Sequence, residues 1–206
     1  MPARILLFAA NLLPLIGVAF WGWDAFELLV LYWCETAVIA FWTIFQIGLQ
    51  PERLDAFLSP TSRSALGGLG RAIFLSIHAG IFMAVHMVFL WSLMGGEWRS
   101  VISGPASFVQ QLVIGNGLWA PLAGLFVVRG FITLLGLAGM SPDPVSSKNV
   151  VFDLYRRIIV MQFTLIAGAW AIQLIGSRIG LVVLIALKIA IDLFFDPFEK
   201  ARKKPA

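Results

Sequence analysis

Charged side chains are scarce in this chain of 206 residues: only 13% are Asp, Glu, Lys or Arg, whereas 60% are hydrophobic. Soluble domains contain about a quarter charged residues, so the composition argues against a soluble fold. A mean hydropathy of +0.91 supports the same conclusion. The single cysteine, Cys34, excludes an intrachain disulfide, and its place in an apolar run is typical of a packing residue. The composition predicts an integral membrane protein.

Several well-defined motifs are also missing. The sequence contains no G-x-S-x-G nucleophile turn, no glycine-rich phosphate loop with its Lys-Ser/Thr, and no H-E-x-x-H zinc motif. Its net charge of +4 is explained by the residues that flank membrane spans, so we expect no nucleic-acid partner. The sequence motifs therefore indicate no particular reaction, and whether the protein is an enzyme stays open.

Long apolar runs recur along the chain, and six of them reach the roughly 20 residues that a membrane-spanning helix needs. These are residues 5–23, 25–49, 71–95, 117–139, 156–176 and 178–196. Without an internal repeat, they predict a single all-α domain over 1–199, followed by a basic tail over 200–206. The segments ERLDAFL and SFVQQLVIG are too short to cross and are expected to lie on the membrane, while the glycines of GGLG (67–70) are expected in a loop.

Positive charge is distributed unevenly around these spans. Eleven of the 15 Lys and Arg residues fall on the side that holds the N-terminus, the second and fourth loops and the C-terminus, and two fall on the other. Because positive residues stay in the cytoplasm, both termini are predicted to be cytoplasmic. The tail EKARKKPA anchors this topology and could also bind anionic lipid of the bilayer.

Polar residues within the spans form two layers by depth. Counting about 1.5 Å per residue places a first layer near the middle of the membrane and a second about 6–11 Å from the cytoplasmic boundary. The first layer consists of Glu35, His86, Arg129 and Lys188, and the second of Asn11, His78, Gln162 and Asp192. Charged groups are costly in a bilayer and usually face the interior of the bundle, so these residues are the candidates for a functional centre.

The two histidines are eight residues apart, which on a continuous helix means about 12 Å along the axis. One metal ion cannot easily bind both rings at that spacing, because a metal–nitrogen bond is only about 2.1 Å long. A divalent metal held by Glu35, His78, His86 and Asp192 is possible by ligand type, although no ligand spacing supports it. Lys188 lies one turn before Asp192 and could pair with it, and Tyr32 could donate its hydroxyl to Glu35.

The stretches NLLPLIGVAF, LYWCETAVIAFW, HAGIFMAVHMVF and LKIAIDLFFD resemble a bacterial family of uncharacterised multi-spanning membrane proteins. That family combines an Asn–Leu first span, a Tyr-Trp-x-Glu stretch, a two-histidine span and a final Lys/Asp span. The resemblance covers spans one to three and six, and Thr36 stands where Asn is expected as often. It implies that the family's marked positions are Tyr32, Trp33, Glu35, His78, His86 and Asp192. With no activity assigned to the family, it implies a topology and candidate residues but no reaction.

Two functional hypotheses follow for this predicted bacterial inner-membrane protein. In the first, Glu35, His86, His78 and Asp192 form a centre that binds a cation or relays protons, with Arg129 and Lys188 as counter-charges, in small-solute transport or membrane enzymology. In the second, the polar groups only fix the helices of a structural or assembly subunit, which forms a homo-oligomer or joins a larger membrane complex.

Overall fold

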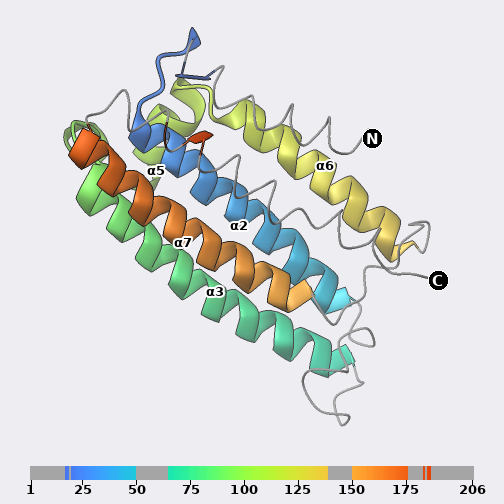
Figure 1. Cartoon of the computed structure of the whole chain (residues 1–206). Helices are drawn as coiled ribbons and strands as arrows, with labels where there is room; N and C mark the ends of the chain where they lie inside the picture. Colours follow the sequence, from blue (N-terminus) through green and yellow to red (C-terminus); the bar gives the residue numbers. More distant parts are fainter. Residues whose placement is uncertain are drawn as a thin grey trace. The chain divides into compact units, whose positions relative to one another are not determined.

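The computed structural model describes residues 17, 18, 20–49, 65–138, 150–175, 183, 185 and 186. Every regular element among them is helical, so the predicted all-α fold is confirmed for this part of the chain (Figure 1). The predicted spans 5–23 and 178–196 lie largely outside the described residues. The segment ERLDAFL and the tail 200–206 lie wholly outside them.

Three of the helices are long and apolar enough to cross a membrane: α2 (Ala25–Leu49), α3 (Ala65–Met94, apolar over Leu69–Met94) and α6 (Trp119–Leu137). On α3, one face presents large apolar side chains that are 51–65% exposed: Ile73, Ile77, Ile81, Val85 and Val88. An apolar face of this length is typical of a helix surrounded by lipid. The structure therefore indicates a membrane protein.

The bounds of α2 agree with the predicted span 25–49, and α6 lies within the predicted span 117–139. By contrast, α3 begins at Ala65, six residues before the predicted start. The prediction of a loop around Gly67–Gly70 is therefore wrong, because these residues are helical. A glycine lowers helix stability by about 1 kcal/mol relative to alanine. The long apolar helix that follows offsets this, because adding a turn to an existing helix is far easier than starting one.

The fourth long helix, α7 (Val150–Ile175), covers residues 156–175 of the predicted span 156–176 and also begins six residues early. Between α3 and α6 lie α4 (Trp98–Val101), α5 (Pro105–Ser107) and the π-helix η2 (Phe108–Gly115). The short helix predicted for SFVQQLVIG is thus present as η2 with the end of α5. Its position on the membrane surface stays a prediction.

The chain divides into two compact units. Unit 1 comprises Met1–Val30, Leu90–Leu118 and Gln162–Ala206, and unit 2 comprises Leu31–Phe89 and Trp119–Met161. We describe each unit by itself. The predicted boundary between a domain over 1–199 and a tail over 200–206 stays a prediction.

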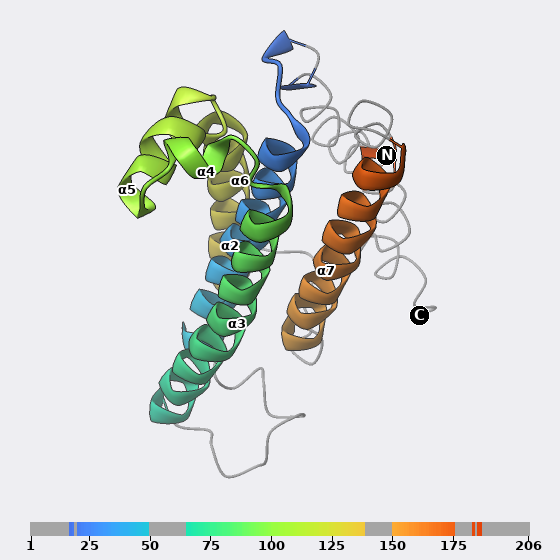
Figure 2. The same ribbon diagram turned by 90° about the vertical axis from the view of Figure 1, so that its left-hand side faces the viewer.

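In unit 2, segments of α2, α3 and α7 run side by side (Figures 1 and 2). Ala40 on α2 and Ala79 on α3 form a buried cluster with Leu154 and Ile158 on α7. A second cluster joins Ile47 and Leu75, and Tyr155 packs against both clusters. Because Ala40 pairs with Ala79 and Ile47 with Leu75, α2 and α3 are antiparallel. Small side chains at such contacts let helix backbones approach closely.

The fourth helix of unit 2, α6, packs on α2 through aromatic rings. The ring centroids of Trp42 and Phe126 are 5.0 Å apart, and those of Phe41 and Phe126 are 5.6 Å apart. Gly130 on α6 is buried beneath the indole of Trp42. The absence of a side chain at Gly130 therefore lets the two helices come together at this point.

Unit 1 is organised around the first turn of α2. The backbone N–H of Glu27 donates to Asp24 Oδ1 at 2.9 Å, and the backbone N–H of Asp24 donates to Glu27 Oε2 at 2.7 Å. This reciprocal arrangement is a capping box, which satisfies two N–H groups at the start of the helix. Gly22, with φ +69°, makes the turn that leads into it.

Asn116 ties the segment before α6 to this capping box. Its side-chain amide donates to Glu27 Oε1, and its backbone carbonyl accepts a hydrogen bond from Trp23 Nε1 at 2.9 Å. Glu27 is only 4% exposed, so its hydrogen bonds to Asp24 and Asn116 compensate for removing the carboxylate from water.

Candidate functional site

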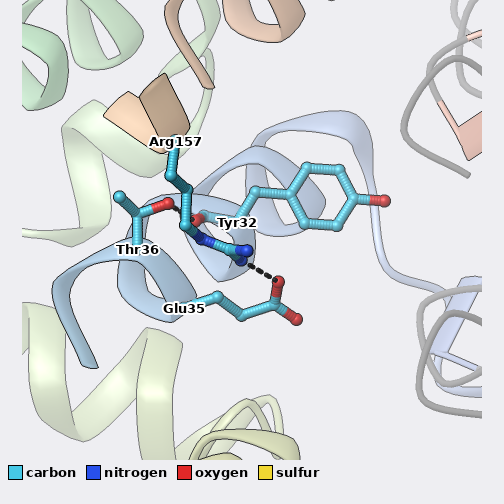
Figure 3. Close-up of polar contacts among 4 residues, drawn as sticks. All are labelled: Tyr32, Glu35, Thr36 and Arg157. Atoms are coloured by element: carbon cyan, nitrogen blue, oxygen red, sulfur yellow. Dashed lines mark hydrogen bonds and ion pairs between the residues drawn. The ribbon is translucent and has the colours of Figure 1, made fainter. Parts of the chain in front are cut away.

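The candidate site of unit 2 is built on an ion pair between α2 and α7. Arg157 Nη2 lies 3.8 Å from Glu35 Oε2, and the two side chains are 31% and 17% exposed (Figure 3). The same two helices also meet where Ala40 on α2 packs against Leu154 and Ile158 on α7. The ion pair is a further contact between them. A separation of 3.8 Å gives electrostatic attraction but is too long for a hydrogen bond.

A second guanidinium, from α6, interacts electrostatically with both members of the pair. Arg129 is half-buried, is attracted by the Glu35 carboxylate and is repelled by Arg157. No hydrogen bond or ion pair of Arg129 occurs within the described part of the chain. With every group ionised, these three side chains carry two positive charges and one negative charge. We call Glu35, Arg129 and Arg157 the charged centre.

The wall of α2 beside the charged centre is buried. Thr36 donates its hydroxyl to the carbonyl of Tyr32 at 3.0 Å, the usual way for a threonine to satisfy its hydroxyl inside a helix. Tyr32 is only 5% exposed, and Figure 3 shows its ring extending away from Arg157. Cys34, next to Glu35 in the sequence, is half-buried and free, in agreement with the packing role predicted for it.

His86 is the buried histidine of unit 2. Its side chain is 4% exposed and shares the inward face of α3 with Leu75, Ala79 and Met83. Nδ1 bonds to the carbonyl of Phe82, one turn earlier. Because a carbonyl only accepts, this bond assigns a proton to Nδ1. Within the residues that the structure describes, the buried Nε2 has no hydrogen-bond partner, so a ring with its proton on Nδ1 has an unused lone pair at Nε2.

His78 is in a different environment on the same helix. It is half-buried among three aromatic rings, with centroid distances of 5.5 Å to Phe74, 5.3 Å to Phe82 and 5.6 Å to Tyr155. The ring of Phe82 also lies 6.4 Å from that of His86. Since α3 is continuous through both histidines and Phe82 contacts each ring, the imidazoles occupy two separate levels, as the spacing predicts.

The structure brings together only part of the predicted set. Glu35 and Arg129 attract each other electrostatically, whereas no hydrogen bond or ion pair joins Glu35 to His86 among the residues that the structure describes. Gln162 is half-buried on α7 and belongs to unit 1. Asn11, Lys188 and Asp192 lie outside the described residues. Across the described ranges, no three His, Cys, Asp or Glu side chains lie close enough together to hold a metal ion.

Arg157 was not among the predicted candidates, because a span beginning at residue 156 places it at the cytoplasmic edge of the membrane. The missed signal was helical spacing: Val151, Leu154 and Ile158 recur at intervals of three and four, which extends the helix upstream of the charges. The capping box at Asp24 and Glu27 was not predicted either, although an acidic cap followed three residues later by Glu is a recognised sequence signature.

The described fold is that of an all-helical membrane protein with charged groups meeting between its helices. Its sequence matches the family of unknown function DUF6498 over residues 1–206, and the chain belongs to this family. No curated protein and no solved structure gives a significant match to the chain. Family membership agrees with the resemblance to an uncharacterised family.

Proposed function

We propose that the chain is a six-span protein of the bacterial inner membrane with both termini in the cytoplasm. The three apolar helices and the concentration of Lys and Arg on one side of the six predicted spans support this topology. Fusions of green fluorescent protein and alkaline phosphatase after residue 200 test it. The fluorescent fusion is expected to be active and the phosphatase inactive, and the opposite result would place the C-terminus outside.

We further propose that unit 2 relays protons in small-solute transport or membrane enzymology, with His86 as the proton acceptor. The observation that carries this proposal is the buried Nε2 of His86, which has no partner in the described part of the chain, while Nδ1 bonds to the carbonyl of Phe82. An imidazole held in one tautomer by a backbone carbonyl is ready to accept a proton at the other nitrogen. The two guanidiniums beside Glu35 oppose cation binding there, which favours the proton relay over cation binding.

Nitrogen NMR tests the acceptor role in protein labelled with ¹⁵N-histidine and reconstituted in nanodiscs. The variant His78→Gln leaves His86 as the only imidazole. The spectrum should show a ring protonated at Nδ1 with an unprotonated Nε2, the tautomer that the bond to the Phe82 carbonyl requires. A ring that carries its proton on Nε2 alone would overturn the assignment.

Proteoliposomes containing a pH-sensitive dye test the transport form of the proposal. A potassium gradient with valinomycin drives proton uptake, and His86→Gln should slow it by about 10²-fold or more, the usual effect of losing an essential acid–base group. His78→Gln is the matched control, because His78 has only ring contacts in the described structure. Equal uptake in wild type and His86→Gln would rule out His86 as part of a transport path.

An assembly subunit is the second candidate function. It is supported by the Glu35–Arg157 pair, which could serve only to fix α2 against α7, and by the large exposed apolar faces. This candidate predicts that a tagged chain extracted from its native membrane in mild detergent migrates as a defined larger complex. A monomer that retains proton uptake would argue against it.

A further inference from the structure

We infer that Trp33 is a positioning residue for His86, because its indole occupies the other backbone carbonyl to which the imidazole could turn. The inference rests on the proposed function, since the orientation of this ring matters for a relay only if His86 accepts protons. It is carried by two side-chain hydrogen bonds to consecutive carbonyls of α3, from His86 Nδ1 to Phe82 and from Trp33 Nε1 to Met83. All four residues belong to unit 2.

The first argument concerns the acceptors within reach of His86. A side-chain donor on a helix reaches the carbonyls three and four residues earlier. For His86 these are the carbonyls of Met83 and Phe82, and the structure shows Nδ1 bonded to Phe82. Turning Nδ1 to Met83 would rotate the imidazole and carry Nε2 to a different place. The choice of acceptor therefore determines where the Nε2 lone pair points.

The second argument is that the Met83 carbonyl has no acceptor capacity left. A carbonyl oxygen has two lone pairs, and inside the continuous helix α3 one of them accepts from the backbone N–H of Met87. The indole of Trp33 takes the other at 2.8 Å. His86 Nδ1 is thereby left with the Phe82 carbonyl.

The third argument is that Trp33 acts from a neighbouring helix. On α2 it lies two turns before Ala40, and Met83 on α3 lies one turn after Ala79, so the bond continues the antiparallel contact in which Ala40 meets Ala79. Met83 is only 6% exposed, which limits competition from water for its carbonyl. The packing of α2 on α3 therefore fixes the ring orientation of His86 from outside its own helix.

Nitrogen NMR in the His78→Gln background tests the positioning, because His86 is then the only imidazole. Trp33→Phe keeps an aromatic ring and removes the donor, which frees the Met83 carbonyl. His86 should then give two sets of ring nitrogen signals, or one broadened set, whereas the protein with Trp33 intact should give one sharp set. One unchanged sharp set in Trp33→Phe would overturn the inference.

Trp42→Phe is the matched control. It is also a tryptophan of α2, but its Nε1 has no hydrogen-bond partner in the described part of the chain. The substitution loosens the packing of α2 without freeing an acceptor near His86, so one sharp set of signals should remain. If Trp33→Phe fails to fold, replacing Trp33 with benzothienylalanine keeps the shape of the indole and exchanges only its N–H for sulfur, and the same signals decide the question.

Proton uptake into proteoliposomes tests the consequence for the relay. Trp33→Phe should slow uptake by about two- to tenfold, because the ring then spends part of its time in the second orientation and the loss of one ordinary hydrogen bond allows a population shift of that size. Trp42→Phe should take up protons as wild type does. Normal uptake in Trp33→Phe together with slow uptake in His86→Gln would overturn the inference and leave the proposed function standing. Equal uptake in wild type and His86→Gln would instead overturn the proposed function, and with it any relay role of Trp33.

Discussion

Gly130 on α6 lies so close to Trp42 on α2 that a Cβ atom at this position would be 2.5 Å from the indole Cζ2. The indole is itself surrounded by Phe41, Phe45 and Phe126, which limits its freedom to move aside. This contact limits how closely α6 can approach α2.

Gly130→Ala is therefore expected to destabilise the protein by about 1–3 kcal/mol, the usual effect of inserting atoms into a packed contact. Gly136→Ala is the matched control on the same helix, because a Cβ there would meet nothing within 4 Å. The control should be neutral or slightly stabilising, since alanine favours a helix over glycine. Unfolding in denaturing detergent measures both, and equal stability of the two variants would contradict the close contact.

The Glu35–Arg157 pair predicts a coupling between the two side chains. Glu35→Gln leaves two guanidiniums facing each other and should destabilise the protein, by less than the roughly 3–5 kcal/mol typical of fully buried pairs because Arg157 is 31% exposed. The double variant with Arg157→Gln should be more stable than the sum of the single effects implies. The exposed Glu97→Gln is a control without an expected effect, and strict additivity would show that the pair is not coupled.

Asn116 should be important for unit 1 because it donates to the buried carboxylate of Glu27. Asn116→Ala is expected to destabilise by about 1–3 kcal/mol through loss of that donor. Asn116→Asp should be worse near neutral pH, since it places a second carboxylate beside Glu27. The difference between the two variants should shrink towards pH 4, where aspartate becomes protonated. A constant difference across pH would contradict the contact.

His78 is expected to tolerate replacement by phenylalanine, because it contacts the rings of Phe74, Phe82 and Tyr155. Such a swap of similar shape should change the free energy of unfolding by less than about 1.5 kcal/mol. Thermal melts in detergent measure the effect alongside His86→Phe, which loses the bond to the Phe82 carbonyl. A large loss from His78→Phe would reveal a polar role for this imidazole.

Hydropathy predicted α2 and α6 well because polar or glycine-containing stretches bound them on both sides. It placed the starts of α3 and α7 six residues late for a common reason. The glycines at 67–70 and the polar stretch from Asp153 to Arg157 lower the local hydropathy, while helix formation continues through them.

The late start assigned to α7 explains why the charged centre was predicted only in part. Counting from a start at residue 156 placed Arg157 at the membrane edge, whereas the helix from Val150 places it two turns in, opposite Glu35. Counting residues from the span ends placed Glu35 and Arg129 in one layer, and the two charges attract each other. It could not show that His86 is held by its own helix, because ring orientation depends on rotamers that sequence spacing does not specify.

The apolar part of α3, Leu69–Met94, has 26 residues and a length of about 39 Å, whereas the hydrocarbon core of a typical bilayer is about 30 Å thick. A helix with that surplus either inclines from the membrane normal or thickens the lipid around it. Since α2 and α7 pack along α3 in unit 2, a change in its inclination would also move Glu35 and Arg157. The acyl-chain length of the surrounding lipid is thereby linked mechanically to the geometry of the charged centre.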